Sequence, residues 1–267
     1  MANQDQQDCY CRHLYLTFFN RNLTIMKTLI STVILLLFFG SLAKSQPYPY
    51  KGSEFVSIAF QTSPDLVNKL VPKPLIANTE GLIGIAIGLQ RMESGFTYHE
   101  MYLAIPVELN GKKGAFIPLM YLNKAMPIYR GREIWGFPKY DAEINFQKDD
   151  KKVTASIYKD GKLLIEADLE LGNVISNIKG SDNLLFVLKY IPSVEEGSID
   201  VKKLNSVFMT NSTYTKYQEA TAKLIINNIP DASIGEIPIL KILDASYSES
   251  NFILGFGKTE YDYLKQK

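Results

Sequence analysis

The chain has 267 residues, of which 46% are hydrophobic and 21% are charged, so it carries enough apolar material for one large domain or two small ones. Lysine and arginine number 29 against 28 aspartates and glutamates, which gives a formal charge of +1. This balance excludes a strongly basic nucleic-acid surface and an acidic tail, and it favours a small or neutral partner.

The N-terminal part of the chain predicts an export signal. Residues 26–45 join one basic residue to an apolar run and to a small-x-small cleavage motif at 43–45, which is typical of a secretory signal peptide. The apolar run is shorter than the roughly 20 residues that span a bilayer, so an uncleaved membrane anchor is the second choice. We expect residues 1–25 to be a non-native upstream extension and Met26 to be the true start. The protein is then exported, periplasmic or secreted, and keeps no stable membrane anchor.

The mature chain is predicted to be one domain without cysteines. Cys9 and Cys11, the two cysteines, both precede Met26, so no disulfide framework is expected after export. Residues 46–267 contain no Ser/Gly/Pro-rich linker, low-complexity tract or internal repeat that would divide them.

Most of this domain is predicted to form strands. Residues 54–62 are rich in aromatic and β-branched side chains, and residues 82–89 form an apolar run broken by glycines, as in a strand covered on both faces. An Asn-Gly pair at 110–111 and an Asp-Gly pair at 160–161 each separate two apolar or alternating segments. Such pairs readily adopt the positive φ angles of tight turns, so two β-hairpins are predicted here.

Helical signals are fewer. Ser63-Pro64-Asp65 predicts the start of a short helix, since serine can cap free amides and proline suits the first helical position. Pro72 and Pro74 end it, and a second helix is predicted around residues 217–226. The expected fold is α+β and mainly β: an antiparallel, curled or closed β-barrel-like sheet around a central pocket, with a few peripheral helices.

Few residue types remain for chemistry. After the signal peptide His99 is the only histidine, and the segment HEMYL lacks the second histidine of the metalloprotease motif H-E-x-x-H. No metal site is expected from one histidine without cysteines. The chain has no G-x-S-x-G elbow, no phosphate-binding loop and no strand-placed G-x-G-x-x-G, so no cofactor is expected either. Lysine and carboxylate chemistry remains.

The stretch GREIWGFPKY places Lys139 among bulky and conformationally restricted residues. A free lysine has a pKa of about 10.4, so only about one molecule in a thousand carries the neutral amine at neutral pH. Desolvation or a nearby cation can lower that pKa by several units and give an amine that attacks a ketone. Composition alone favours the alternative that Lys139 is a solvated lysine beside an aromatic strand.

Five segments, in chain order, resemble the acetoacetate decarboxylase family. They are LVPKPL (70–75), YHEMYLAIPVELNGKKGAFIPLMYLN (98–123), MPIYRGREIWGFPKY (126–140), LKYIPS (188–193) and YDYLK (261–265). The chain is therefore identified as a member of that superfamily from about Tyr48 onward. The resemblance implies a Schiff-base lyase that decarboxylates a β-keto acid such as acetoacetate, needs no cofactor and assembles into a homo-oligomer.

The resemblance also implies roles for single residues. By position, Lys139 is the Schiff-base lysine, and Glu100 is the active-site carboxylate near it. The predicted substrate pocket comprises Tyr140, Arg132, Glu133, Phe137, Trp135, Ser53 and Ile85. A structural ion pair is an equal alternative for Arg132 and Glu133.

Three departures from the family pattern concern the substrate. The family has a second lysine where this chain has Tyr140, so desolvation must lower the pKa of Lys139 here. A gapless alignment places Ser53 and Ile85 where the family has a substrate-facing arginine and glutamate. Because arginine binds carboxylates with two parallel hydrogen bonds, its loss means that the sequence does not identify which oxo-acid is the substrate. An aldolase or dehydratase using the same lysine on oxo-acids, or a non-catalytic small-molecule-binding protein, are the alternatives.

Overall fold

The computed structural model describes residues 47–229, 234 and 237–265, and residues Pro47–Lys267 form one compact unit. The predicted extension (1–25), the predicted signal peptide (26–45) and both cysteines lie outside the described residues. No helix in the described ranges is long and apolar enough to cross a membrane.

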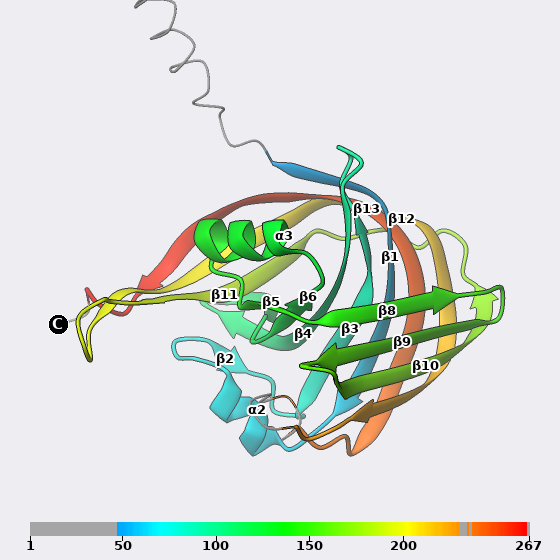
Figure 1. Ribbon diagram of the computed structural model, residues 1–267, viewed down its shortest axis with the longest axis horizontal. Coiled ribbons are helices and arrows are strands. Elements are labelled where there is room, and N and C mark those ends of the chain that lie inside the picture. The colour runs from blue at the N-terminus through cyan, green and yellow to red at the C-terminus, as the bar shows by residue number, and fades with distance from the viewer. Residues whose placement is uncertain (1–46, 230–233, 235–236, 266–267) are drawn as a thin grey trace, which may run out of the picture. The chain divides into compact units, whose positions relative to one another are not determined.

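The described chain is built mainly of strands, which form one sheet (Figure 1). The strands are β1 (Tyr48–Gln61), β2 (Ile76–Ala77), β3 (Leu82–Arg91), β4 (Thr97–Leu109), β5 (Lys112–Phe116), β6 (Met120–Leu122), β7 (Lys139–Asp141), β8 (Glu143–Lys148), β9 (Lys152–Lys159), β10 (Lys162–Val174), β11 (Asn183–Pro192), β12 (Ile199–Ile226) and β13 (Lys241–Asp262). The helical elements are α2 (Pro64–Leu70), α3 (Ala125–Arg130) and the π-helical turn η1 (Gly131–Trp135). In the view of Figure 1, α3 lies above strands β4, β5 and β6, and α2 lies below them.

The sheet closes on itself, which confirms the predicted curled or closed architecture. Its strands run in the order β11-β5-β4-β3-β1-β13-β12-β10-β9-β8, and β11 also pairs with β12, so the strands from β11 to β12 form a ring. Most neighbours are antiparallel, but β11 pairs with β5 and β6 pairs with β7 in parallel. The long strands β12 and β13 pair with each other and curve around one side of the barrel.

The local signals of the sequence are confirmed where they concern turns. Asn110 and Gly111 have φ angles of 51° and 78°, and Asp160 and Gly161 have 51° and 74°, so both predicted pairs form hairpin turns. The first predicted helix is α2, although the side chain of Ser63 makes no capping hydrogen bond.

The second predicted helix, at residues 217–226, is wrong. These residues form the end of β12, where Tyr217 lies opposite Ser248 of β13 and Ile226 lies opposite Ile165 of β10. Backbone pairing with β10 along the segment, and with β13 at its start, outweighs its moderate helix propensity, because helix propensity differs by only about 0.7 kcal/mol per residue among ordinary residues.

Two clusters of buried hydrophobic side chains form the core. The larger cluster contains, among others, Ile58, Ile85 and Leu103 from β1, β3 and β4. The smaller cluster contains Tyr98, Met120, Trp135 and Phe137, so it surrounds the start of β7. Lys139 therefore begins its strand inside a largely apolar part of the molecule.

Candidate active site

The π-helical turn η1 delivers Lys139 to the interior. After α3, the amide of Gly136 donates to the carbonyl of Gly131 at 3.0 Å, which closes the wide turn. Gly136 then takes a left-handed conformation with φ of 92°, and β7 starts at Lys139, opposite Met120 of β6. Such π-helical turns are rare and occur frequently at functional sites.

Gly131 provides the space that the lysine side chain occupies. A Cβ atom built on Gly131 would lie 2.6 Å from Cδ and 2.8 Å from Cε of Lys139. Because real Cβ atoms do not approach other atoms so closely, any larger residue at position 131 would displace the lysine.

Trp135 holds the turn against the barrel. Its indole Nε1 donates to the carbonyl of Gly255 in β13 at 2.9 Å, and its own carbonyl accepts from Asn205 Nδ2 of β12 at 2.8 Å. Trp135, predicted as a pocket residue, is 5% exposed and does not line the cavity described below. Its contacts fix the turn that carries Lys139.

Lys139 and Glu100 form a buried pair. The Nζ atom of Lys139 lies 3.6 Å from Oε2 of Glu100, and the two residues are 6% and 4% exposed. Burial lowers the pKa of Lys139, and the negative charge of Glu100 opposes that shift. Within the described residues Oε2 of Glu100 has no hydrogen-bond partner, so this oxygen is available to a ligand or a proton.

Aromatic rings enclose the amine. The Nζ atom lies 5.4 Å from the ring centroid of Phe137 and 5.8 Å from that of Tyr98. The hydroxyl groups of Tyr98 and Tyr50 are 3.1 Å apart. Burial raises the pKa of Tyr50 to about 12 and that of Tyr98 well above its ordinary value, so both remain neutral phenols near neutral pH.

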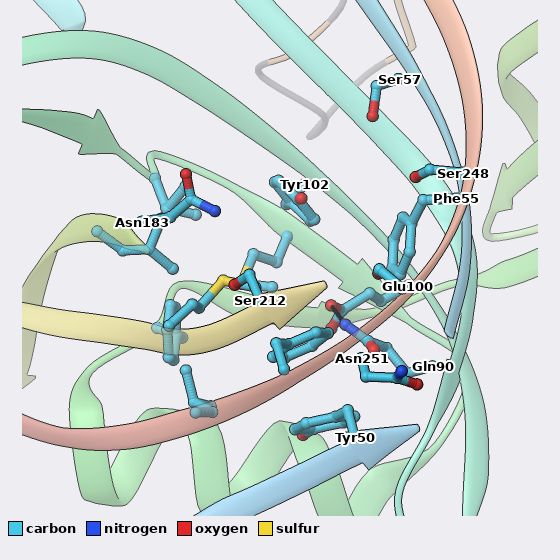
Figure 2. Close-up of a pocket in the computed structure, with 18 of the residues that line it drawn as sticks. Tyr50, Phe55, Ser57, Gln90, Glu100, Tyr102, Asn183, Ser212, Ser248 and Asn251 are labelled. Atoms are coloured by element: carbon cyan, nitrogen blue, oxygen red, sulfur yellow. Dashed lines mark hydrogen bonds between the residues drawn. The ribbon is translucent and has the colours of Figure 1, made fainter. Parts of the chain in front are cut away.

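A cavity of about 150 Å³ opens beside this pair (Figure 2). Its wall is made by residues of the barrel strands and of the segments before β6 and β7. They are Tyr50, Phe55, Ser57, Gln90, Tyr98, Glu100, Tyr102, Ile117, Met120, Phe137, Lys139, Asn183, Leu185, Met209, Ser212, Thr213, Tyr214, Ser248, Ser250, Asn251, Phe252 and Leu254. Figure 2 shows Glu100, Gln90 and Asn251 close together, with Asn183 across the cavity from them. The predicted central pocket thus lies within the barrel and contains both predicted catalytic residues.

The cavity holds one acidic and one basic residue. Among the described residues that line it, Lys139 is the only cation and Glu100 the only anion. The other polar lining residues are serine, threonine, asparagine, glutamine and tyrosine. A ligand therefore meets hydrogen-bonding groups without further charge.

Gln90 is the missed residue that contacts Glu100 directly. Its Nε2 donates to Oε1 of Glu100 at 2.7 Å, and its Oε1 accepts from the hydroxyl of Ser53 at 2.8 Å. In the β3–β4 hairpin Gln90 lies opposite Tyr98 and Gly88 opposite Glu100, so Gln90 and Glu100 are diagonal neighbours on one face. Counting back from the turn at Ser94-Gly95 would have given this register, whereas the gapless alignment pointed to Ile85.

The structure separates the other predicted pocket residues from the cavity. Phe137 lines it, but Ile85 is buried in the larger core cluster, and Ser53 is fully buried behind Gln90. Neither residue lines the cavity, because Ile85 lies an odd number of residues from Gln90 in β3 and so faces the other side of the sheet, while Gln90 covers Ser53.

Arg132, Glu133 and Tyr140 do not line this cavity. Arg132 and Tyr140 line a second hollow, which shares only Lys139 with the cavity, and the Arg132 guanidinium lies 5.7 Å from the Tyr140 ring centroid. Glu133 is exposed, and its carbonyl accepts from Nζ of Lys189. Arg132 and Glu133 form no ion pair with each other in the described structure. The exposed position of the π-helical turn explains this placement.

A closed barrel that buries one lysine beside one carboxylate contains the groups that chemistry through a lysine amine requires. The family model of acetoacetate decarboxylase (ADC) matches residues 39–264. An acetoacetate decarboxylase of Burkholderia ambifaria (strain MC40-6) is 31% identical over 229 residues, which cover 82% of this chain and 91% of that protein.

Solved structures give the same picture. The acetoacetate decarboxylase of Legionella pneumophila superposes with a TM-score of 0.72 at 26% identity, over 82% of this chain and 89% of the other. The enduracididine biosynthesis enzyme MppR, complexed with pyruvate, shares the fold at a TM-score of 0.72 and 14% identity, over 82% of this chain and 91% of the other. The chain belongs to the acetoacetate decarboxylase family, whose decarboxylases are lyases.

Proposed function

We propose that this protein is a Schiff-base-forming lyase that decarboxylates a β-keto acid, such as acetoacetate, through an imine on Lys139. The observation that carries the proposal is the lysine amine buried 3.6 Å from the carboxylate of Glu100 in the wall of the cavity. Burial favours the neutral amine, which is the nucleophile that imine formation requires.

The reaction proceeds in four steps. The neutral Nζ of Lys139 attacks the keto carbon, forming a C–N bond while the carbonyl π electrons move to oxygen. Proton transfers, with Glu100 as the nearby acid and base, convert that oxygen to water, which leaves a protonated imine. The bond between the carboxylate carbon and the α-carbon then breaks, and its electron pair forms an enamine as carbon dioxide departs. Protonation of the α-carbon and hydrolysis of the imine release the ketone and restore the amine.

The charges of the cavity support a substrate with a single carboxylate. A protonated imine on Lys139 is balanced by Glu100, and no other cation lines the described cavity. A carboxylate that remained on the product would be buried without a partner, which costs roughly several kcal/mol. A β-keto acid avoids this cost, because its carboxylate leaves as neutral carbon dioxide.

Reductive trapping tests the proposal. The protein is treated with acetoacetate and borohydride, and the modified residue is mapped by mass spectrometry, while evolved carbon dioxide is measured in parallel without borohydride. We expect a reduced adduct on Lys139, its loss in both Lys139→Arg and Lys139→Met, and its retention in Lys113→Arg, an exposed lysine. A folded wild-type protein that gives no adduct on Lys139 contradicts the proposal and favours a non-catalytic binding protein.

A second candidate is aldol-type condensation or dehydration of an oxo-acid through the same imine. The neutral hydrogen-bonding side chains of the cavity favour it, because Asn183, Ser212 and Asn251 could hold a second carbonyl or hydroxyl group. The two candidates differ in one product. Trapping on Lys139 without evolved carbon dioxide, for every β-keto acid supplied, favours the second.

We also propose that the enzyme acts outside the cytoplasm as a homo-oligomer. The export proposal is supported by the signal-like composition of residues 26–45, and the oligomer by the resemblance to the family. Cell fractionation and N-terminal sequencing of the purified protein test the first, and light scattering tests the second. A mature N-terminus upstream of residue 43 contradicts cleavage after the small-x-small motif.

A further inference from the structure

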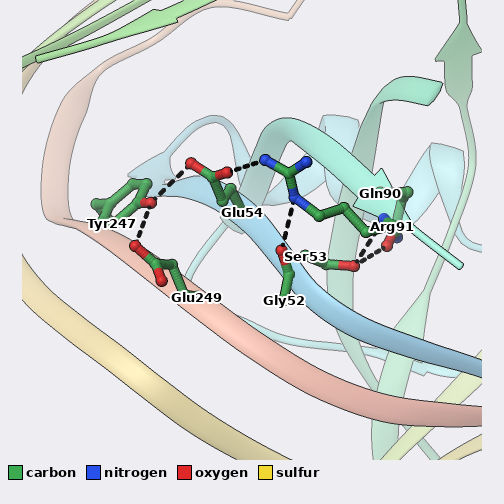
Figure 3. A network of polar contacts seen from close by, with 7 residues as sticks. All are labelled: Gly52, Ser53, Glu54, Gln90, Arg91, Tyr247 and Glu249. Carbon is green, nitrogen blue, oxygen red and sulfur yellow. Dashed lines mark hydrogen bonds and ion pairs between the residues drawn. The ribbon is translucent and has the colours of Figure 1, made fainter. Parts of the chain in front are cut away.

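Ser53 is the buried origin of a hydrogen-bonded chain that leads to Lys139. Its hydroxyl accepts the backbone N–H of Arg91 at 3.1 Å and lies 2.8 Å from Oε1 of Gln90 (Figure 3). Gln90 continues to Glu100, which faces Lys139. All four side chains of the chain are buried, with Ser53 at 0% and Gln90 at 6% exposure.

The first link fixes the direction of the amide. A backbone N–H can only donate, so the oxygen of Ser53 accepts from Arg91 and its own proton is directed to another acceptor. That acceptor is Oε1 of Gln90, and the amide NH₂ must then face Glu100. The opposite orientation would place the amide carbonyl against the carboxylate of Glu100, two acceptors at 2.7 Å.

The second link fixes the site of protonation on Glu100. Because Oε1 of Glu100 accepts the N–H of Gln90, a proton carried by this residue belongs on Oε2. Oε2 is the oxygen 3.6 Å from Nζ of Lys139, and it has no hydrogen-bond partner within the described residues.

We propose that Ser53 and Gln90 are positioning residues that confine the proton of Glu100 to Oε2, where it exchanges with the lysine and its imine. This inference rests on the proposed function, since it assigns to one oxygen the acid and base steps of imine formation. It explains why two neutral side chains that do not contact the amine are buried next to Glu100.

Few other groups near the pair titrate. The tyrosines that line the cavity have raised pKa values and remain neutral near neutral pH; they are Tyr50, Tyr98, Tyr102 and Tyr214. The guanidinium of Arg91 is paired with Glu54, and that of Arg132 faces the carbonyl of Lys139. A change in the pH profile of Lys139 after substitution of Gln90 therefore reports on the Gln90–Glu100 link.

The substitution Gln90→Glu tests the proposal sharply. At low pH the new carboxyl group is protonated and repeats the amide, because its carbonyl accepts from Ser53 and its hydroxyl donates to Oε1 of Glu100. At higher pH it ionises, and two adjacent carboxylates then stabilise the ammonium form of Lys139. The substitution Gln218→Glu is the matched control, since Gln218 is also 6% exposed but does not line the cavity.

The measurement is the rate at which a small uncharged aryl acetate acylates Lys139 as a function of pH, with the modified residue mapped by mass spectrometry. We expect Gln90→Glu to match the wild type at low pH and to fall about tenfold below it once the new carboxyl group ionises. Gln218→Glu keeps the wild-type profile. A Gln90→Glu profile parallel to the wild type overturns the proposal, and so does a loss at every pH in a variant with native near-ultraviolet circular dichroism.

The substitution Ser53→Ala tests the first link. Without the hydroxyl the amide can turn, so Glu100 can carry its proton on Oε1. We expect the rate of imine trapping with acetoacetate to fall about tenfold without loss of substrate affinity, and Ser53→Thr, which keeps the hydroxyl, to recover most of it. Ser246→Ala removes a buried hydroxyl that does not line the cavity and serves as the control. An unchanged rate in Ser53→Ala overturns the proposal.

The two experiments separate this inference from the proposed function. Acylation of Lys139 needs no substrate and reports only on the ionisation of its amine. If acetoacetate gives no adduct on Lys139 but Gln90→Glu shifts the acylation profile, the positioning role of Ser53 and Gln90 is correct and the proposed reaction is wrong. If the adduct forms and the profile does not shift, the proposed reaction is correct and the positioning role is wrong.

Discussion

Two opposed effects determine the pKa of the Lys139 amine. Burial lowers its pKa and Glu100 raises it, and burial dominates. Because the neutral amine is the reactive form, imine trapping should increase with pH through the lowered pKa and level off at a pH below the ordinary pKa of a lysine. Removing the negative charge with Glu100→Gln should move the acylation midpoint of Lys139 to lower pH. A midpoint that moves upward contradicts this balance.

Gly131 is predicted to be indispensable for the position of the lysine. In Gly131→Ala the new methyl group meets the lysine stem at 2.6 Å, so we expect a loss of about 1–3 kcal/mol in the free energy of unfolding and at least a tenfold loss of imine trapping. Urea unfolding and trapping measure the two effects. Gly84→Ala is the control, since its nearest neighbour would lie at 3.6 Å. Equal behaviour of the two variants would show that the lysine can adopt another path.

The site residues that could be predicted from the sequence lie within continuous segments that resemble the family. Lys139 and Glu100 lie within segments that match the family pattern, and the structure brings them together. Gln90 was missed because its place depends on the β3–β4 register, which the turn sets and a gapless alignment ignores. Trp135 was assigned to the pocket because an aromatic residue near a lysine fits either a pocket wall or an anchor, and only its contacts decide.

At the scale of elements, the turn between α3 and β7 depends on Gly136. This residue has φ of 92°, and a Cβ atom there would lie 2.3 Å from Cβ of Lys189. The substitution Gly161→Ala separates backbone strain from this clash, because Gly161 has φ of 74° and nothing within 4 Å.

We expect Gly161→Ala to cost about 1 kcal/mol of unfolding free energy and Gly136→Ala several times more, as measured in urea. Reduced acylation of Lys139 should accompany only the second variant, because that turn delivers the lysine. Similar losses in both variants would mean that Lys189 moves aside easily.

The elements themselves were predictable to the extent that they are local. The hairpins at 110–111 and 160–161 were correct because a two-residue turn is specified by its own residues. Residues 217–226 were misassigned because their conformation is decided by β10 and β13, which lie about fifty residues before and thirty after them in the chain. The residues in the second half of β12 therefore do not by themselves indicate a strand.

At the scale of the whole molecule, the extent of strand pairing differs around the ring, and the β11–β5 junction is short. Strands β11 and β5 meet through only the pairs Leu185–Ala115 and Phe186–Phe116, with the amide of Ile117 donating to Phe186 at 2.9 Å. Strands β12 and β13 pair over most of their length instead. The β11–β5 seam should open first, since local opening follows the number of hydrogen bonds and packed contacts.

Hydrogen exchange measures this difference. We expect the amide of Ile117 to exchange faster than the paired amides in the middle of β12, under conditions where the protein stays folded. Borohydride-trapped substrate should slow exchange at Ile117, because this residue lines the cavity. Equal protection along the whole ring would show that it opens only by global unfolding.

The near cancellation of charge in the cavity also bears on how substrate arrives. One lysine and one glutamate at 3.6 Å produce little long-range field, and the formal charge is only +1 for the whole chain and −1 for residues 46–267, which have 25 lysines and arginines against 26 aspartates and glutamates. Anionic molecules are therefore not drawn toward the mouth of the barrel from a distance. Capture should proceed at the pace of unassisted diffusion and vary little with ionic strength, so the enzyme would work equally well in dilute and in saline surroundings.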